Sequence, residues 1–204
     1  MGEREGGSRS ERKRRGILEA GRAIFLNEGY AGAGMEQVAR AASVSTATLY
    51  AHFPSKADLF EAVVGGAIAR LTHDLEDARV EGGARQRLLA LALALGRFYS
   101  APLSRSLFRL VTSERRRFNS LADRFLERSR VEIGGAAVAL VADLRDAGLI
   151  RVAKPAWAAG QLLGMIEHAT LVIGLMAGDE VNPRRPLEAI CEDAVETFLA
   201  RYGA

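Results

Sequence analysis

The sequence predicts an all-α protein, and three observations carry that prediction. Apolar residues recur three and four positions apart along most of the 204 residues, as they do on one face of an α-helix. No alternating apolar and polar run of strand length occurs outside short ambiguous pieces. Glycine and proline stand where the helical patterns stop, as at Gly29, Pro54 and Gly82.

We expect about nine helices behind a tail of residues 1–10, which is rich in glycine, serine and charge and should be disordered. The first helix keeps the 3.6-residue period up to Gly29, which can end it in a left-handed conformation. The clearest pattern is the last, because one apolar stripe continues from Leu187 to Tyr202. The predicted helices span residues 11–28, 35–42, 46–52, 55–79, 84–100, 103–116, 119–147, 156–177 and 185–202.

Charge divides the chain into two parts. Residues 1–56 hold 9 Lys/Arg against 6 Asp/Glu, whereas residues 57–204 hold 19 of each. All the excess positive charge therefore lies in the first quarter, which is weak evidence for a polyanionic partner. We expect a small domain over residues 11–56 and a larger helical domain over residues 57–204.

Two helices of about two turns each follow one another over residues 35–54. Helices this short persist only when they pack against something, because nucleation costs more than so few hydrogen bonds return. Ser43 falls where the connecting turn needs a left-handed residue, and Ser45 can cap the second helix. Phe53 precedes Pro54, which excludes Phe53 from the helical region. The layout predicts a helix-turn-helix, whose second helix enters the major groove of DNA.

Leu49 is the large apolar residue of the second short helix, and we expect it to face the core. The opposite side then presents small and hydrogen-bonding side chains, namely Ala47, Thr48 and Ala51, with Tyr50 and His52 at the flanks. Hydroxyls can bond phosphates or base edges, and methyl groups can touch the methyl of thymine. Lys56 adds a cation in the first turn of the next helix, and Arg14 belongs to a basic run that can follow the DNA backbone.

Residues 17–60 resemble the DNA-binding domain of the tetracycline-repressor (TetR) family of bacterial transcriptional regulators. The resemblance rests on ILEAGRAIFLNEGY (17–30) and MEQVARAASVSTATLYAHFPSKADLF (35–60). It implies that Tyr50, His52 and Lys56 grip phosphates and that Thr46, Ala47 and Ala51 lie nearest the bases. The expected DNA-binding set is Arg14, Ser45, Thr46, Ala47, Thr48, Tyr50, Ala51, His52 and Lys56.

Two positions depart from the family pattern. Serine stands at position 43, where the family usually has glycine, and a left-handed serine costs roughly 1 kcal/mol. Met35 stands where the family often has a threonine or serine cap, so Gly34 is expected to cap the first short helix.

The larger domain suggests two further tasks, although a single-chain core accounts for its apolar residues equally well. Helices 156–177 and 185–202 are more apolar than one subunit needs, which suggests a two-fold homodimer. The expected interface residues are Leu162, Ile166, Leu187, Ile190, Val195 and Phe198. The resemblance also implies a cavity for a small, lipophilic effector, with Phe98, Phe108, Val111, Trp157, Met165 and His168 as candidate lining.

The most concrete interpretation is a ligand-responsive repressor that binds a pseudo-palindromic operator in double-stranded DNA. An all-α enzyme and a protein-interaction adaptor are the alternatives. The chain lacks a nucleophile–base constellation, a phosphate loop and a metal cluster, and His73-Asp74 is better explained as a surface pair, so we expect neither enzyme activity nor a cofactor. Cys191, the lone cysteine, and the charged N-terminus favour a cytoplasmic protein with no membrane partner. Whether His168 or Arg115–Arg117 contact a ligand stays open.

Overall fold

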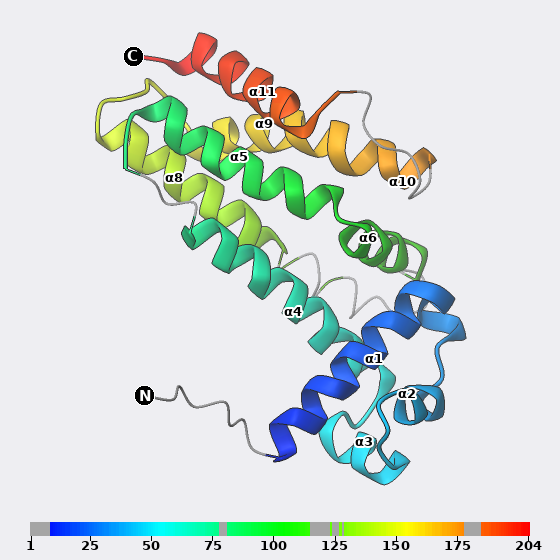
Figure 1. Ribbon diagram of the computed structural model, residues 1–204. Helices are drawn as coiled ribbons and strands as arrows, with labels where there is room; N and C mark the ends of the chain where they lie inside the picture. Colours follow the sequence, from blue (N-terminus) through cyan, green and yellow to red (C-terminus); the bar gives the residue numbers. More distant parts are fainter. Residues whose placement is uncertain (1–8, 78–80, 115–122, 124–126, 128, 178–184) are drawn as a thin grey trace.

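The computed structural model describes residues 9–204 except 78–80, 115–122, 124–126, 128 and 178–184. Over the described residues the regular elements are helices, and extended backbone pairs at the isolated bridge between Ile150 and Gly203. The predicted all-α class is therefore confirmed. Figure 1 shows a small head, formed by α1 to α3, and a larger body above it, with α4 running from one to the other.

Most helices begin and end close to the predicted residues, and the start expected at residue 119 lies outside the described residues. The head contains α1 (Arg9–Gly32), α2 (Met35–Ala41) and α3 (Thr46–His52), and α4 spans Lys56–Asp77. The body contains α5 (Ala84–Ser100), α6 (Pro102–Glu114), the π-helical turn η1 (Arg130–Gly134) continuing into α8 (Gly135–Asp146), the rod of α9 (Pro155–Glu167), η2 (His168–Val172) and α10 (Ile173–Ala177), and α11 (Leu187–Tyr202). If η1 with α8 counts as one helix, and α9 with η2 and α10 as another, the described ranges contain the nine helices expected.

The start and the end of α1 both differ from the expectation. Arg9 and Ser10 are already helical, so the predicted tail is too long by two residues, and residues 1–8 lie outside the description. Gly29 has the positive φ that was expected, with φ 71° and ψ 177°, a combination essentially restricted to glycine. It kinks the helix instead of ending it, and one more helical turn follows as far as Gly32.

Two hydrophobic clusters hold the molecule together, and α4 belongs to both. The head cluster gathers α1 to α3 with the first half of α4, from Leu59 to Ile68, and reaches Leu107 on α6. The body cluster takes Leu71 and Leu75 from the second half of α4. The head core thus extends past the predicted domain boundary at residue 56, because short helices cannot bury enough apolar surface alone.

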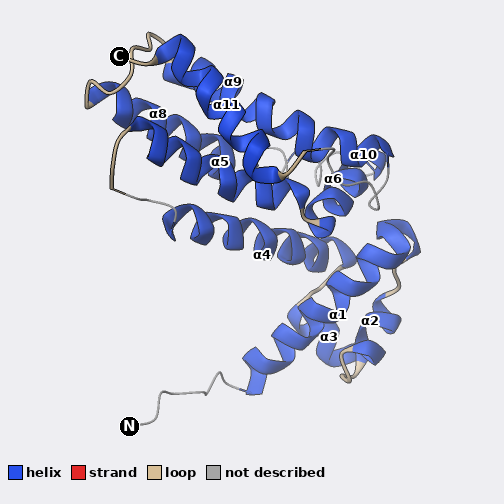
Figure 2. Ribbon diagram, turned by 45° about the horizontal axis from the view of Figure 1, so that its top comes forward, coloured by secondary structure: helices blue, strands red, loops and turns tan. Residues whose placement is uncertain are grey.

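The body is built around α5, which packs against α8, α9 and α11 (Figure 2). Gly96 lets α11 approach closely, since a β-carbon there would lie 2.6 Å from Leu187 Cδ1 and 3.2 Å from Cys191 Sγ. The thiol of Cys191 is buried and donates to the carbonyl oxygen of Ala92 at 3.3 Å. Burial raises the pKa of this thiol to about 11, so Cys191 behaves as a small hydrophobic residue and not as a reactive thiolate.

The rod from Pro155 to Ala177 is one helix that is long and apolar enough, by length and composition, to cross a membrane. Only 33% of its most apolar window is buried within the chain. One face of the rod therefore fills the core of the body. The other face carries exposed apolar side chains, including Trp157 and Met176.

Candidate nucleic-acid interface

The turn between α2 and α3 is closed by two backbone hydrogen bonds. The amide of Val44 donates to the carbonyl of Ala39 and that of Ser43 to the carbonyl of Arg40, both at 3.0 Å, which is the pattern of a Schellman motif. Ser43 occupies the left-handed position with φ 54°, as predicted. Among the described residues it is the one non-glycine with a positive φ. The motif fixes the angle at which α3 leaves α2.

The first turn of α3 is capped as predicted. Ser45 Oγ accepts a hydrogen bond from the amide of Thr48 at 3.1 Å, and the hydroxyls of Ser45 and Thr48 lie 2.9 Å apart. Gly34 caps α2 with an extended backbone and no side-chain bond, also as predicted. At the far end Phe53 leaves the helical region with φ −139° and ψ 95°. Local residues therefore define α3 at both ends.

The two faces of α3 differ sharply in exposure. Leu49 is fully buried and Phe53 is 3% exposed, so both anchor the helix in the head core. The outer face exposes the residues expected to lie nearest DNA, namely Thr46, Ala47, Tyr50 and Ala51. His52 is half-buried, with its ring centroid 6.4 Å from that of Phe53. The helix therefore presents a shallow surface of methyl groups, one hydroxyl and one phenol.

The basic start of α1 lies beside this surface (Figure 1). The guanidinium carbon of Arg14 sits 5.4 Å from the centroid of the Phe53 ring, a cation–π contact that orients the side chain near the end of α3. Arg9, Arg12 and Arg15 are exposed on the same first turns of α1. The structure thus brings Arg14 together with α3, whereas the sequence could only place it in a basic run.

Lys56 is held within the head. Its ammonium donates to the carbonyl oxygens of Tyr30 at 2.7 Å, Ala33 at 2.9 Å and Ala31 at 3.3 Å. The same nitrogen lies 4.8 Å from the centroid of the Tyr30 ring. No sequence signal indicated these contacts, because the partners lie 23 to 26 residues earlier in the chain.

The comparisons with known proteins match both parts of the chain. A family model described as bacterial regulatory proteins of the tetR family matches residues 17–63. A second, described as the C-terminal domain of AefR-like transcriptional repressors, matches residues 86–204, more than half of the chain. The chain belongs to the TetR family. It is accordingly a DNA-binding transcriptional regulator and not an enzyme, as predicted.

Individual relatives agree with the TetR assignment. The chain is 38% identical over 91 residues to the HTH-type transcriptional activator FasR of Mycolicibacterium smegmatis, covering 44% of this chain and 42% of that protein. It is 38% identical over 84 residues to the HTH-type transcriptional repressor KstR of the same species, covering 41% of each. The matched part thus spans about four tenths of these curated relatives. A TetR-family regulator structure from Mesorhizobium loti superposes with a TM-score of 0.85 at 29% identity, covering 97% of this chain and 100% of that one.

The candidate ligand residues of this TetR-family chain do not gather at one place. Phe98, Phe108 and Met165 are half-buried against the body core, and Val111 packs against the head core. Trp157 is 72% exposed and His168 is also exposed. Trp157 and His168 both project from the outer face of the long rod, so the candidate set lines no single cavity within the described part of the chain. Arg115–Arg117 lie outside the described residues.

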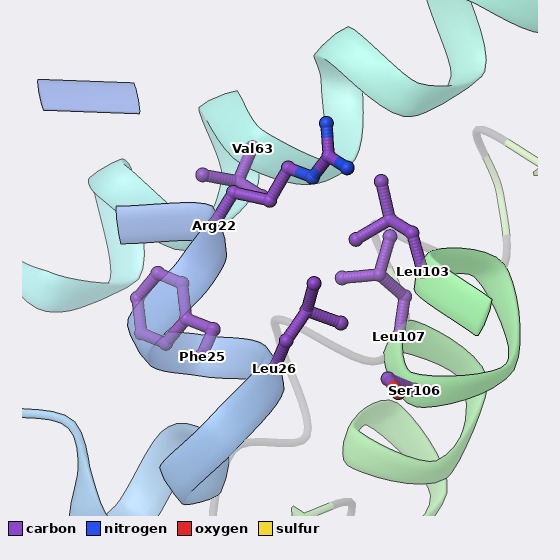
Figure 3. Close-up of a pocket in the computed structure, with 7 residues that line it drawn as sticks. All are labelled: Arg22, Phe25, Leu26, Val63, Leu103, Ser106 and Leu107. Atoms are coloured by element: carbon purple, nitrogen blue, oxygen red, sulfur yellow. The ribbon is translucent and has the colours of Figure 1, made fainter. Parts of the chain in front are cut away.

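A shallow hollow lies where the head meets the body, between α1, α4 and α6 (Figure 3). Leu26 of α1 faces Leu103 and Leu107 of α6 across it, with Arg22 at its edge. It leaves essentially no free volume for a water molecule, so it is a packing seam and not an effector cavity.

The candidate dimer residues of this TetR-family chain are mostly buried within the chain itself. Leu162 and Ile166 are 0% exposed, and Ile190, Val195 and Phe198 are at most 8% exposed. Leu187 is half-buried and packs against the same core. They fill the body core of the single chain, so a partner would have to contact other side chains of these helices. The apolar stripe of α11 faces α5 and α9.

No feature of the sequence indicated that Arg105 is a buried cation. Arg105 is 3% exposed, and its Nε and Nη2 donate to the carbonyl oxygen of Ser100 at 3.2 and 2.6 Å. Its side chain packs over Gly174, where a β-carbon would lie 2.6 Å from Arg105 Cδ. Nearby, burial and then Glu167 raise the pKa of Tyr99, and burial raises the pKa of Glu167. Within the described ranges no three His, Cys, Asp or Glu side chains gather as metal ligands would.

Proposed function

We propose that this TetR-family chain is a homodimeric repressor that binds a pseudo-palindromic operator and is released from it by a small, lipophilic molecule. The observation that supports this most directly is the division of α3, with Leu49 buried and Thr46, Ala47 and Ala51 exposed. Such a helix can enter the major groove without steric conflict. Repression is part of the proposal, since relatives named as an activator and as a repressor match equally well.

The proposed contacts follow from exposure and chemistry. Thr46, Ala47 and Ala51 touch base edges, where methyl groups favour thymine. Tyr50, His52 and Arg14 contact phosphates at the flanks, together with Ser45 and Thr48 at the start of the helix. With base-reading side chains this small, the readout depends on methyl contacts and on DNA shape.

DNA binding is tested with the region upstream of the gene that encodes the protein, across a salt series. The proposal predicts sequence-specific binding whose logarithm falls steeply with the logarithm of the salt concentration. His52→Ala should weaken operator binding about tenfold or more, because a hydrogen bond to a charged group contributes about 1.5–3 kcal/mol. His73→Ala, the same substitution on an exposed position of α4, is the control. Binding without sequence preference, or equal losses in both variants, would count against the proposal.

The proposed dimer uses the outer face of the long rod. Trp157 is 72% exposed and Met176 is 82% exposed, which leaves large apolar side chains uncovered. Gly160 and Gly164 lie one turn apart on this rod, and a β-carbon at either would meet nothing within 4 Å. Glycine inside a helix costs roughly 0.5–1 kcal/mol against alanine, and this chain's own packing does not require it there. Close approach by the same helix of a second copy accounts for both features.

This interface predicts the effect of a bulky residue at its centre. Gly164→Leu should yield a monomer at micromolar concentration by analytical ultracentrifugation while the helical circular dichroism is kept. Gly135→Leu is the matched control, since Gly135 is an exposed helical glycine whose β-carbon would also meet nothing. A Gly164→Leu protein that stays dimeric would exclude this face. In the dimer the two α3 helices should fit half-sites about 34–36 Å apart.

The effector response is proposed to pass through α4, since it contributes Leu59 to the head core and Leu71 to the body core. A ligand that fits one position of α4 better than another shifts the population between two head spacings, with a coupling of typically about 1–3 kcal/mol. Lipophilic compounds that raise the thermal midpoint should also change operator affinity. A bound compound that leaves operator affinity unchanged would argue against this mechanism. We place this regulator in the cytoplasm, with its DNA.

A further inference from the structure

Lys56 joins the two ends of the helix-turn-helix. Its partners Tyr30, Ala31 and Ala33 immediately precede α2, and Lys56 itself begins α4, immediately after α3 and its turn. One ammonium therefore links the segment that enters the motif to the segment that leaves it. The contacts to Tyr30 and Ala33 are part-buried, which strengthens them relative to contacts in full solvent, and the contact to Ala31 is exposed.

We propose that Lys56 is a positioning residue that clamps the helix-turn-helix at its base and does not contact DNA phosphate. A lysine ammonium has three N–H donors, and three carbonyl oxygens within 3.3 Å account for all of them. The Tyr30 ring adds a fourth favourable contact from its face. A phosphate contact would require the side chain to give up at least one of these bonds.

The carbonyls that Lys56 binds explain why a cation is needed there. The last carbonyl groups of a helix have no partner within the helix, and the helix dipole places partial negative charge on them. Tyr30 and Ala31 form the last turn of α1, beyond the kink at Gly29, and Ala33 follows directly. Because α2 and α3 have seven residues each, they depend on such fixed ends to hold their angle.

The test separates clamping from phosphate contact in one variant. Lys56→Met keeps a long side chain and removes the charge and the three donors. Hydrogen exchange of the α2 and α3 amides is measured in the full-length protein without DNA. Binding to a random-sequence duplex is then measured across a salt series. Lys13→Met is the matched control, because Lys13 lies on the basic first turns of α1, outside these contacts.

We expect Lys56→Met to lower the protection of the α2 and α3 amides at least about tenfold, corresponding to about 1.4 kcal/mol. The slope of log K against log salt should equal that of the wild type. Lys13→Met should leave amide protection intact, and each phosphate contact that it removes should reduce the slope by about 0.9. Loss of all amide protection in the head of Lys56→Met would also support the positioning role of Lys56. The measurement is made without DNA, so the loss of a DNA contact cannot cause it.

Unchanged protection of the α2 and α3 amides in Lys56→Met would overturn the proposal, whatever the slope of log K against log salt. A slope reduced by about 0.9 per half-site would overturn it as well, even if protection fell, since the ammonium would then serve a phosphate. The exchange measurement needs no DNA. A wild-type protein that fails to bind any duplex would therefore refute the proposed function without deciding the role of Lys56.

Discussion

Ser43→Gly should stabilise the head, and the size of the effect follows from one backbone angle. Ser43 has φ 54° at the left-handed position of the turn, where a residue with a β-carbon pays roughly 1–2 kcal/mol. Glycine removes that cost but loses roughly 0.5–1 kcal/mol more conformational entropy on folding. Because Ser43 is exposed, its side chain contributes little packing. The net gain should be about 0.5–1 kcal/mol.

The gain is measurable in two ways. Hydrogen exchange at the amides of α2 and α3 should slow by a few-fold. The thermal midpoint should rise by about 1–4 °C for a chain of this size, compared at equal protein concentration. Ala41→Gly is the matched control, because Ala41 is an exposed residue within α2, where glycine should destabilise by roughly 0.5–1 kcal/mol.

The two glycine substitutions, two residues apart, should therefore act in opposite directions. Equal destabilisation by Ser43→Gly and Ala41→Gly would refute the reasoning, because it would mean that position 43 carries no backbone strain. An unchanged stability in Ser43→Gly, with Ala41→Gly destabilised as expected, would show that the entropy of glycine cancels the whole left-handed penalty.

Three further outcomes follow from packing and titration. Leu49→Ala should destabilise the head by about 2–5 kcal/mol in urea denaturation and abolish operator binding, because Leu49 is fully buried. Gly174→Ala should cost about 1–3 kcal/mol by displacing the buried Arg105, whereas Gly135→Ala, whose added β-carbon meets no neighbour, should not. Burial raises the Cys191 pKa from 9.0 to about 11, so this thiol favours folding below pH 9 and loses that contribution as pH rises through about 11. Cys191→Ala should remove that part of the alkaline decline in the free energy of unfolding, and an identical decline in both proteins would contradict the assignment.

The features that the sequence predicted well depend on near neighbours in the chain. The turn at Ser43, the cap at Ser45 and the break at Pro54 each follow from the backbone preferences of one or two residues. The inward position of Leu49 follows from it being the large apolar residue on a helix of seven. The helix-turn-helix and most helix ends could therefore be predicted correctly.

The rod from Pro155 to Ala177 shows where such prediction stops. Apolar residues surround most of it, so periodicity does not distinguish the face that fills the core from the face that a partner could cover. Leu162 and Ile166 were assigned to a partner but are buried in the chain, whereas Trp157 and His168 were assigned to a pocket but face outward. Both differences have one cause, because the sequence does not define which side of this helix faces the core.

By itself the sequence determined that this protein is helical, that its head is a helix-turn-helix, and that α3 exposes small side chains. These properties arise from local backbone preferences and from the 3.6-residue period. Only the tertiary structure decided which side of the long rod is exposed, that Arg105 is buried, and that Lys56 binds the carbonyls at the end of α1. Those properties require contacts between residues far apart in the chain, and the free energy that selects them comes from packing.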